Sequence, residues 1–307
     1  MIYIKSVIEI LRHPLNENRK LKVLIFLIWW KVNQYLFKLP SFIQITPEAK
    51  CICYPNSSYG GLVLYMILPE YPQMNFVYRV LNNNDVFVDI GANIGVYSLI
   101  AASKITKGKI FAFEPTKEML KIFYENIHLN NFSEKIKVIE KAVSDTNTPI
   151  HFTVSNISDT NHISYGKYDE KNSISVNSTT IDHFLKINNI DHIDMLKIDV
   201  EGAELKVLKG AKKSLKEKRI SYILLEINTC SKLFNSYTVE SLEFLTKYDY
   251  IIYFFDKNNK MQKIDNFKDL ENKTMNVLAI NNKKEINKSL NTRQRFTDRS
   301  TLLNREA

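Results

Sequence analysis

The segment from Asp85 to Ala102, DVFVDIGANIGVYSLIAA, constrains the fold of this 307-residue chain more than any other. An apolar run ends at Asp89, and Gly91 and Gly95 precede a second apolar run. A buried strand that turns through glycines into a helix is typical of nucleotide-binding α/β folds. Asp89 stands where the G-x-G-x-x-G dinucleotide fingerprint has its first glycine, so this loop departs from that fingerprint.

The pattern after this segment predicts an α/β fold with a doubly wound, mostly parallel sheet of seven strands, because short apolar runs alternate with helical patterns. We expect strands at residues 86–90, 109–114, 136–143, 194–199, 222–227, 250–255 and 275–280, and helices at 96–103, 117–130, 181–187 and 204–216. Residues 149–178 alternate in polarity, which predicts a β-hairpin insert near the ligand end of the sheet.

Three regions are expected along the chain. Residues 1–84 form a helical and irregular N-terminal extension that is interrupted by prolines, and residues 85–282 form the α/β domain. Residues 283–307 form a basic polar tail, which we expect to be flexible. The tail carries seven Lys or Arg against three acids, so its net +4 is nearly half of the chain's +9. The remaining positive charge is spread thinly and does not by itself indicate a nucleic-acid partner.

Residues 20–38 leave two interpretations open. The uninterrupted apolar run from Val23 to Trp30 is far shorter than the ~20 residues that span a bilayer. Lysines flank this run, and two tryptophans end it, which suits a helix that lies on a membrane surface. A helix packed against the main domain fits equally well. No secretory signal is evident, so we expect a cytoplasmic protein, located at the inner face of the membrane under the first interpretation.

The cysteine pattern indicates neither a disulfide framework nor a zinc site. Cys51 and Cys53 form a C-x-C without a second pair, and Cys230 stands alone. We therefore expect reduced thiols, and no metal is predicted.

Two carboxylates suggest which nucleotide binds. A dinucleotide pyrophosphate would be repelled by Asp89, whereas S-adenosyl-L-methionine carries a cationic sulfonium and an amino group. Gly91 permits close backbone approach, and Gly95 lets the following helix pack against the sheet. Glu114 ends the second strand, from which an acid accepts hydrogen bonds from ribose hydroxyls, and Pro115 could pack on the adenine. A helix-capping Asp89 and a surface Glu114 are the alternatives.

The fourth strand and the turn after it, IDMLKIDVEGAELKVLKGA (193–211), supply the catalytic candidates. Strand alternation puts Lys197 and Asp199 on one side, and a lysine in a buried strand needs an anionic partner. We predict Asp199 and Glu201 as bases, with Lys197 holding or tuning them. The alternative for Glu201 and Glu204 is a structural role, in which their negative charge interacts favourably with the dipole of the helix that begins there.

These stretches together resemble the FkbM-like family of class I S-adenosylmethionine-dependent methyltransferases. FVDIGANIGVYSL, IFAFEPTKEMLKIFYENIHLNN, STTIDHFL and MLKIDVEGAELKVLKGA carry the resemblance, which spans residues 85 to 228. It implies a Rossmann-like fold, a cofactor pocket at Asp89, Gly91, Asn93 and Glu114, and an adenine contact in KAVSD (141–145), which includes Ala142. Family members often have Glu-x-His after the fifth strand, where this chain has Glu226 and Asn228.

The resemblance further implies O-methylation of a sugar hydroxyl in a glycan or a lipid-linked glycan. Three alternatives remain: an RNA ribose methyltransferase, a NAD-linked oxidoreductase and a membrane-associated protein that binds the cofactor without catalysis. No (Asp/Asn)-Pro-Pro-aromatic stretch follows the fourth strand, which argues against methylation of a nucleic-acid base; nucleic acid is not the expected partner. His151, His162 and His183 stay open as bases.

Overall fold

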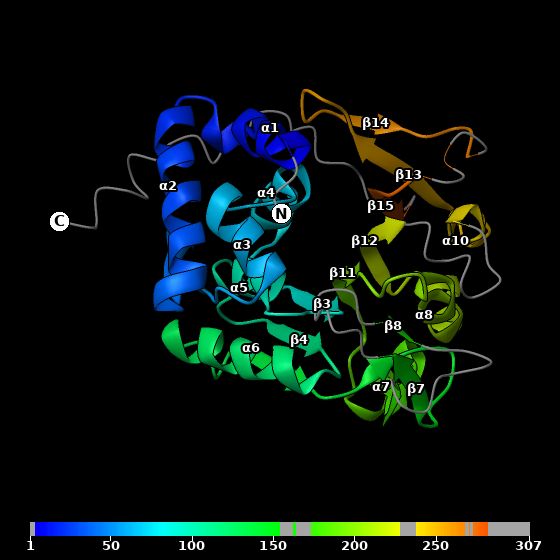
Figure 1. The fold of residues 1–307 in the computed structure, drawn as a ribbon. Coiled ribbons are helices and arrows are strands. Elements are labelled where there is room, and N and C mark those ends of the chain that lie inside the picture. Colours follow the sequence, from blue (N-terminus) through cyan, green and yellow to red (C-terminus); the bar gives the residue numbers. More distant parts are fainter. Residues whose placement is uncertain are drawn as a thin grey trace.

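The computed structural model describes residues 4–153, 162–163, 173–227, 238–267, 270 and 273–281. Within these residues a mixed eight-stranded sheet forms the centre of the molecule, in the order β14-β13-β15-β12-β11-β3-β4-β5 (Figure 1). The strands are β3 (Val86–Ile90), β4 (Lys109–Phe113), β5 (Ile136–Ile139), β11 (Ile193–Ile198), β12 (Ile220–Ile227), β13 (Tyr250–Phe255), β14 (Met261–Lys263) and β15 (Met275–Asn281).

The five strands from β12 to β5 run parallel, whereas β15 is antiparallel to both β12 and β13. All seven predicted strands are present, and the fold is the predicted doubly wound α/β class. The count of seven was wrong, because β14 adds an eighth, antiparallel edge strand beside β13. Its short sequence, MQK, has no apolar alternation from which a strand could be predicted.

Helices cover both faces of the sheet (Figure 1). One face carries α4 (Tyr71–Val80), α5 (Val96–Ala102) and α6 (Lys117–Leu129), and the other carries α7 (Ile181–Ile187), α8 (Glu204–Gly210), α9 (Lys212–Lys216) and α10 (Thr238–Thr246). Strand alternation divides the core accordingly: Phe87 and Met195 face the first layer, whereas Val88 and Leu196 face the second. The predicted helix 204–216 is divided at Ala211 into α8 and α9.

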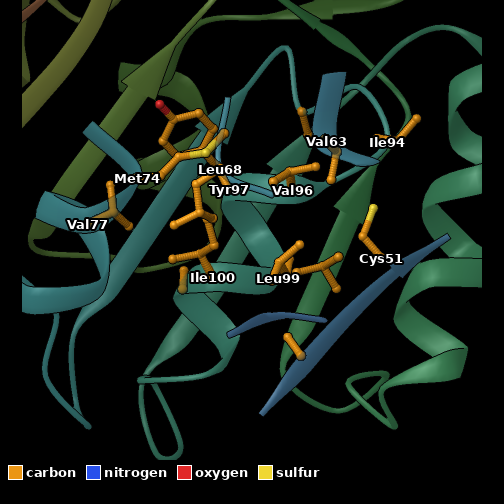
Figure 2. Close-up of a cluster of buried hydrophobic side chains, with 14 of the residues drawn as sticks. Cys51, Val63, Leu68, Met74, Val77, Ile94, Val96, Tyr97, Leu99 and Ile100 are labelled. Carbon is orange, nitrogen blue, oxygen red and sulfur yellow. The ribbon is translucent and has the colours of Figure 1, made fainter. Parts of the chain in front are cut away.

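The N-terminal extension packs into the first of these cores. It contains α1 (Ile4–Arg12), η1 (Pro14–Asn16), α2 (Lys20–Val32), the π-helix η2 (Asn33–Phe37) and α3 (Ser58–Met66). Figure 2 shows Val63 of α3 and Met74 of α4 in one cluster with Leu99 of α5. The extension and the sheet share this core, so the packing does not mark a domain boundary at residue 84. That boundary stays a prediction.

Two strands in the extension were not predicted. β1 (Ser41–Thr46) and β2 (Ala49–Cys53) form an antiparallel hairpin. The Ile52 amide donates to Asn126 Oδ1 of α6 at 2.7 Å, so a distant helix side chain satisfies the edge of the hairpin. Cys51 and Cys53 are buried with free thiols, as expected for reduced cysteines; Cys230 lies outside the described residues.

The insert contains three strands where a hairpin of two was predicted. β7 (Ile150–Thr153) lies between β8 (His162–Ile163) and β9 (Ser173–Val176). The predicted strand 136–143 ends early at Ile139, and β6 (Ala142–Val143) pairs instead with β10 (Ser178–Thr179). Ile150 and Val176 of the insert pack against Ala142 and Ala203, with Val200 beside them. The insert therefore lies next to the carboxyl end of β11, near the ligand end of the sheet as expected.

No helix among the described residues is long and apolar enough to cross a membrane. The tail at 283–307 lies outside the described residues, as does Asn228.

Candidate functional site

A pocket opens at the carboxyl ends of the central parallel strands, where doubly wound sheets bind their ligands. Its lining comes from the loop after β3 (Ile90, Gly91, Ala92, Asn93), the turn after β4 (Phe113, Glu114, Pro115, Thr116), the segment Lys141, Ala142, Val143, and the ends of β11 and β12 (Lys197, Asp199, Val200, Glu201, Glu226). Helices complete it with Val96, Tyr97 and Met119, and the N-terminal extension adds Tyr59 and Glu70.

The structure brings most of the predicted site residues together. Eight of them line the pocket: Gly91, Asn93, Glu114, Pro115, Ala142, Lys197, Asp199 and Glu201. Asp89 and Gly95 do not line it. The binding or catalytic role of each residue stays a prediction, and the placement shows which of them could touch one ligand.

The glycines of the β3–α5 loop have distinct structural roles. Gly91 has φ +72°, and a Cβ there would lie 1.8 Å from the carbonyl oxygen of Asp199. The loop after β3 and the end of β11 therefore meet as closely as two backbones can. Gly95 has φ +89°, and a Cβ there would lie 2.1 Å from the ring of Phe123 in α6. Gly95 thus permits close packing of α6, whereas the sequence suggested packing of the following helix against the sheet.

Glu114 is buried and held by two backbone amides. Its Oε2 accepts from the Asn93 N–H at 2.9 Å, and its Oε1 accepts from the Thr116 N–H at 2.9 Å. Burial raises the pKa of this carboxyl, and the hydrogen bonds partly oppose that rise. The Thr116 side chain is a third hydrogen-bond partner. Because a carboxylate offers about four lone-pair sites, Glu114 keeps acceptor capacity for a ligand's hydroxyl group.

Lys197 is the buried cation of the site. Parallel pairing places it opposite Asp89 in the neighbouring strand, and its Nζ lies 3.8 Å from Asp89 Oδ1 and 3.0 Å from Asp199 Oδ2. It also lies 4.8 Å from the centre of the Tyr97 ring. Burial alone would lower the pKa of Lys197, but the carboxylates of Asp199, Asp89 and Glu70 outweigh it and raise that pKa.

Asp89 lies beneath the pocket rather than in its wall. Its carboxylate is fully buried, and Oδ2 accepts a hydrogen bond from the Ser98 hydroxyl at 2.7 Å. Burial raises its pKa, which Lys197 and Ser98 oppose. Asp89 would therefore act on a ligand indirectly, by holding Lys197, which lines the pocket. Direct contact between Asp89 and a cofactor stays a prediction.

Four carboxyl groups from three segments of the chain gather beside Lys197: Glu70, Asp199, Glu201 and Glu226. Burial and the neighbouring Asp199 raise the pKa of Glu226 to about 10. This direction favours the protonated acid at neutral pH, the form in which Glu226 donates a hydrogen bond to Asp199. Burial would raise the pKa of Asp199, but Lys197 and this hydrogen bond lower it. Asp199 is thus a carboxylate fixed between one cation and one acid.

Glu201 differs from these neighbours in its pKa and its backbone. Burial, and then repulsion by Asp199, raise its pKa to about 7, while Lys197 acts in the opposite direction. Its φ is +52°, in the left-handed region that is costly for a residue with a side chain. A carboxyl that titrates near neutral pH at a strained position is typical of a functional site.

Tyr59, Glu70 and Glu226 are among the pocket residues that were not predicted as site residues from the sequence. Glu226 had a usable signal, because an acid ends the strand adjacent to β11. Tyr59 and Glu70 had none, since only the packing of α3 and α4 against α5 brings them to the sheet. Glu70 Oε2 accepts from the Tyr97 hydroxyl at 2.6 Å and from Asn276 Nδ2 at 3.1 Å.

Other candidates lie elsewhere. Glu204 Oε1 accepts from the Gly202 amide at 2.8 Å, which matches the helix-terminus alternative for that residue. His151 and His183 are exposed and do not line the pocket, and the side chain of His162 lies outside the described residues. Among the residues that the structure describes, no group of three or more His, Cys, Asp or Glu is arranged to hold a metal ion.

Comparison with known proteins gives concordant results. The family model of the methyltransferase FkbM domain matches residues 89–252. The hexuronic acid methyltransferase AglP of Haloferax volcanii is 27% identical over 146 residues, which cover 47% of this chain and 56% of that protein. The 2-O-methyltransferase NoeI of Sinorhizobium fredii is 29% identical over 154 residues, which cover 45% of this chain and 61% of that protein.

The chain therefore spans between 56% and 61% of the length of these two curated relatives. Among solved structures, an rRNA methylase from Streptococcus thermophilus superposes with a TM-score of 0.41 at 12% identity, covering 69% of this chain and 96% of that chain.

Proposed function

Because this chain belongs to the FkbM methyltransferase family, we propose that it is an S-adenosylmethionine-dependent O-methyltransferase acting on a sugar hydroxyl, in a glycan or a lipid-linked glycan. The observation that carries the proposal is the make-up of the pocket. Glu114 follows β4, whereas Asp199 and Glu201 follow β11 and Glu226 lies near the end of β12, on the other side of β3. One pocket thus offers a hydroxyl acceptor on one side and a group of acids around a cation on the other.

The residues present fit the cofactor. Glu114 accepts from the backbone amides of Asn93 and Thr116 and hydrogen-bonds the Thr116 side chain as well, which leaves acceptor capacity for a ribose hydroxyl. Pro115 and Ala142 offer apolar surface for the adenine, and the backbone at Gly91 and Asn93 lies between the two sides. The excess of carboxylates over Lys197 suits a ligand with a sulfonium and an ammonium group. When bound, S-adenosylmethionine supplies a methyl group whose bond to sulfur breaks as the acceptor oxygen bonds to it.

Glu201 is our candidate for the general base. A base is most effective when its pKa lies near the working pH, and the pKa of Glu201 is about 7. Its carboxylate would accept the proton of the acceptor hydroxyl. Asp199 is a weaker base because Lys197 and Glu226 stabilise its charge, so we assign it to positioning the hydroxyl and Lys197 to holding Asp199.

The same cluster weighs against RNA as the acceptor. Phosphates that flank an RNA ribose would come close to Asp199 and Glu201, and like charges in a poorly solvated pocket repel strongly. A sugar hydroxyl without adjacent anionic groups avoids that cost. A protein that binds the cofactor without catalysis remains the alternative from a different class.

Calorimetry tests the cofactor site. Glu114→Ala should raise the Kd for S-adenosylmethionine at least tenfold while the thermal unfolding temperature still indicates a folded protein. Glu118→Ala is the matched control, since Glu118 is exposed on the next helix and does not line the pocket. Equal affinity in the two variants would mean that the pocket is misassigned.

Transfer of a labelled methyl group tests the acceptor. We would offer the wild-type protein separate pools of glycan, lipid-linked glycan and RNA, and expect label in a carbohydrate fraction. Label only in RNA would favour the ribose methyltransferase, and cofactor binding with no labelled product would favour the non-catalytic alternative.

A further inference from the structure

The outer surface of α2 and η2 is apolar where a surface helix is normally polar. Of the sixteen large hydrophobic side chains that are exposed in the described residues, eleven lie between Leu21 and Phe42. Ile25, Ile28, Tyr35 and Leu36 are each more than 60% exposed. We call this surface, from Leu21 to Phe42, the α2 patch. Figure 1 shows α2 at the edge of the molecule, on the side away from β13 and β14.

The fold does not need this apolar surface. Val23, Leu27 and Trp30 are the buried residues of α2, and their spacing forms a single helical stripe that packs towards α3. This stripe anchors the helix, whereas the most exposed apolar side chains, such as Ile25 at 61% and Ile28 at 68%, contribute little to the internal packing. An exposed apolar surface of this extent marks a binding surface.

Charge indicates what binds there. No acidic residue occurs between Glu17 and Glu48, whereas five basic residues do: Arg19, Lys20, Lys22, Lys31 and Lys38. A second copy of the patch would bring like charges together, and the tail at 283–307, with net +4, would be repelled as well. An anionic lipid surface is complementary to both properties, since its acyl chains accept the apolar side chains and its headgroups attract the lysines.

We propose that the α2 patch binds the surface of an anionic membrane, with α2 and η2 lying in the plane of the interface. No helix in the described part of the chain is able to span a bilayer. The 13 residues of α2 would lie along the surface for about 20 Å at the α-helical rise, and η2 continues from them.

The patch is also close to the pocket. α3 packs against α2, and Tyr59 of α3 lines the pocket. One helix layer therefore separates the membrane-binding surface from the site. If the proposed function holds, this arrangement suits an acceptor sugar that is linked to a lipid; membrane binding itself is independent of that function.

The two tryptophans of the chain provide the assay. Trp29 is 44% exposed in the patch and Trp30 is fully buried beneath it. Vesicles that contain phosphatidylglycerol should shift the emission to shorter wavelength and sediment with the protein, and vesicles of phosphatidylcholine alone should do so much less. Trp29→Phe should keep the sedimentation but lose the shift. Salt at 0.5 M should weaken binding, because the lysine contribution is screened.

Variants locate the surface. Ile25→Glu combined with Ile28→Glu should reduce partitioning into the anionic vesicles at least tenfold, with the unfolding temperature unchanged because both side chains are exposed. Ile187→Glu is the control, since Ile187 is 59% exposed on α7 and lies outside the patch. Should the double variant fail to fold, Lys20→Glu with Lys22→Glu tests the same surface through charge and should also reduce binding.

Three results would overturn the proposal. The first is sedimentation of the wild-type protein with neither type of vesicle at low salt, and the second is binding of the folded patch variants that equals that of Ile187→Glu. Alternatively, a dimer that forms without lipid and dissociates in the Ile25→Glu, Ile28→Glu variant would assign the surface to a second copy. None of these measurements uses methyl transfer, so their failure is distinct from failure of the proposed function.

Discussion

Replacing Lys197 by methionine should destabilise the protein strongly, because it removes the cation between Asp89 and Asp199. The Lys197 side chain is 7% exposed, and that of Asp89 is fully buried. Removing one partner of a buried ion pair costs about 3–5 kcal/mol, since the remaining charge loses its partner without regaining water. Methionine nearly preserves the volume, so the packing change should be small. We therefore expect the free energy of unfolding to fall by about 3–5 kcal/mol at pH 8.

The loss should shrink as the pH falls. In the wild-type protein the pKa of Asp199 is lowered, so its charge contributes stability above the unfolded pKa of about 3.9 and that stability is lost below it. In the variant, loss of the cation should raise further the pKa of Asp89, which burial already raises, and should move the pKa of Asp199 above the unfolded value. The native state then binds protons more tightly than the unfolded chain, so acidification towards pH 5 should recover part of the loss.

Urea denaturation at pH 8 and pH 5 measures both effects. Lys213→Met is the control, because Lys213 pairs with Glu217 at 3.9 Å on the surface, where its side chain is 68% exposed. That variant should lose less than about 1 kcal/mol at either pH. The reasoning is refuted if Lys197→Met loses as little as the control at pH 8, or if its loss grows on acidification.

Three further substitutions test the site. Glu201→Gln should lower kcat at least ~10²-fold with the cofactor Kd unchanged. Wild-type activity should rise with pH around 7, where Glu201 loses its proton, and the variant should lack this rise. Normal turnover would exclude Glu201 as the base. Glu226→Gln should unfold at the wild-type urea concentration, because glutamine still donates to Asp199 as the protonated acid does, and a large loss would mean that Glu226 is ionised. Gly95→Ala should lower stability by at least about 1–2 kcal/mol through its φ of +89° alone, and overlap of the new Cβ with a phenylalanine ring of α6 should add to this loss. Gly61→Ala is the control and should show no such loss, because the nearest atom apart from the helix's own backbone is 3.7 Å away. Equal unfolding midpoints for the two variants would contradict the packing argument.

The apolar pattern of the sequence predicted much of the fold. Most strand and helix positions from Val86 onward follow from the apolar pattern. The sheet is covered by helices on both faces, so its strands need apolar side chains on both sides. The departures occur where pairing or packing overrides the pattern. Residues 136–143 appear as one strand in sequence, but β5 ends at Ile139 and β6 pairs with β10, beside the insert. The hairpin of β1 and β2 is held in part by Asn126, which is 74 residues from Ile52 in the chain.

Within the site, the sequence alone determined which acids stand at strand ends, because the carboxyl ends of parallel strands meet at one edge. It therefore located Glu114, Lys197 and Asp199 in one pocket. Only the tertiary structure decided their environment. Burial is a property of the assembled core, so the pKa of Glu201 near 7 and the proton on Glu226 depend on what surrounds them. Glu70 reaches the site only because α4 packs on α5.

The N-terminal extension shows the same division. Between residues 18 and 47 the sequence contains apolar residues and five basic residues but no acid. This composition left open whether α2 packs inward or faces outward. Tertiary packing decided that it does both. A helix presents its side chains all around its axis, so neighbouring α3 buries one stripe, Val23, Leu27 and Trp30, and leaves the rest exposed.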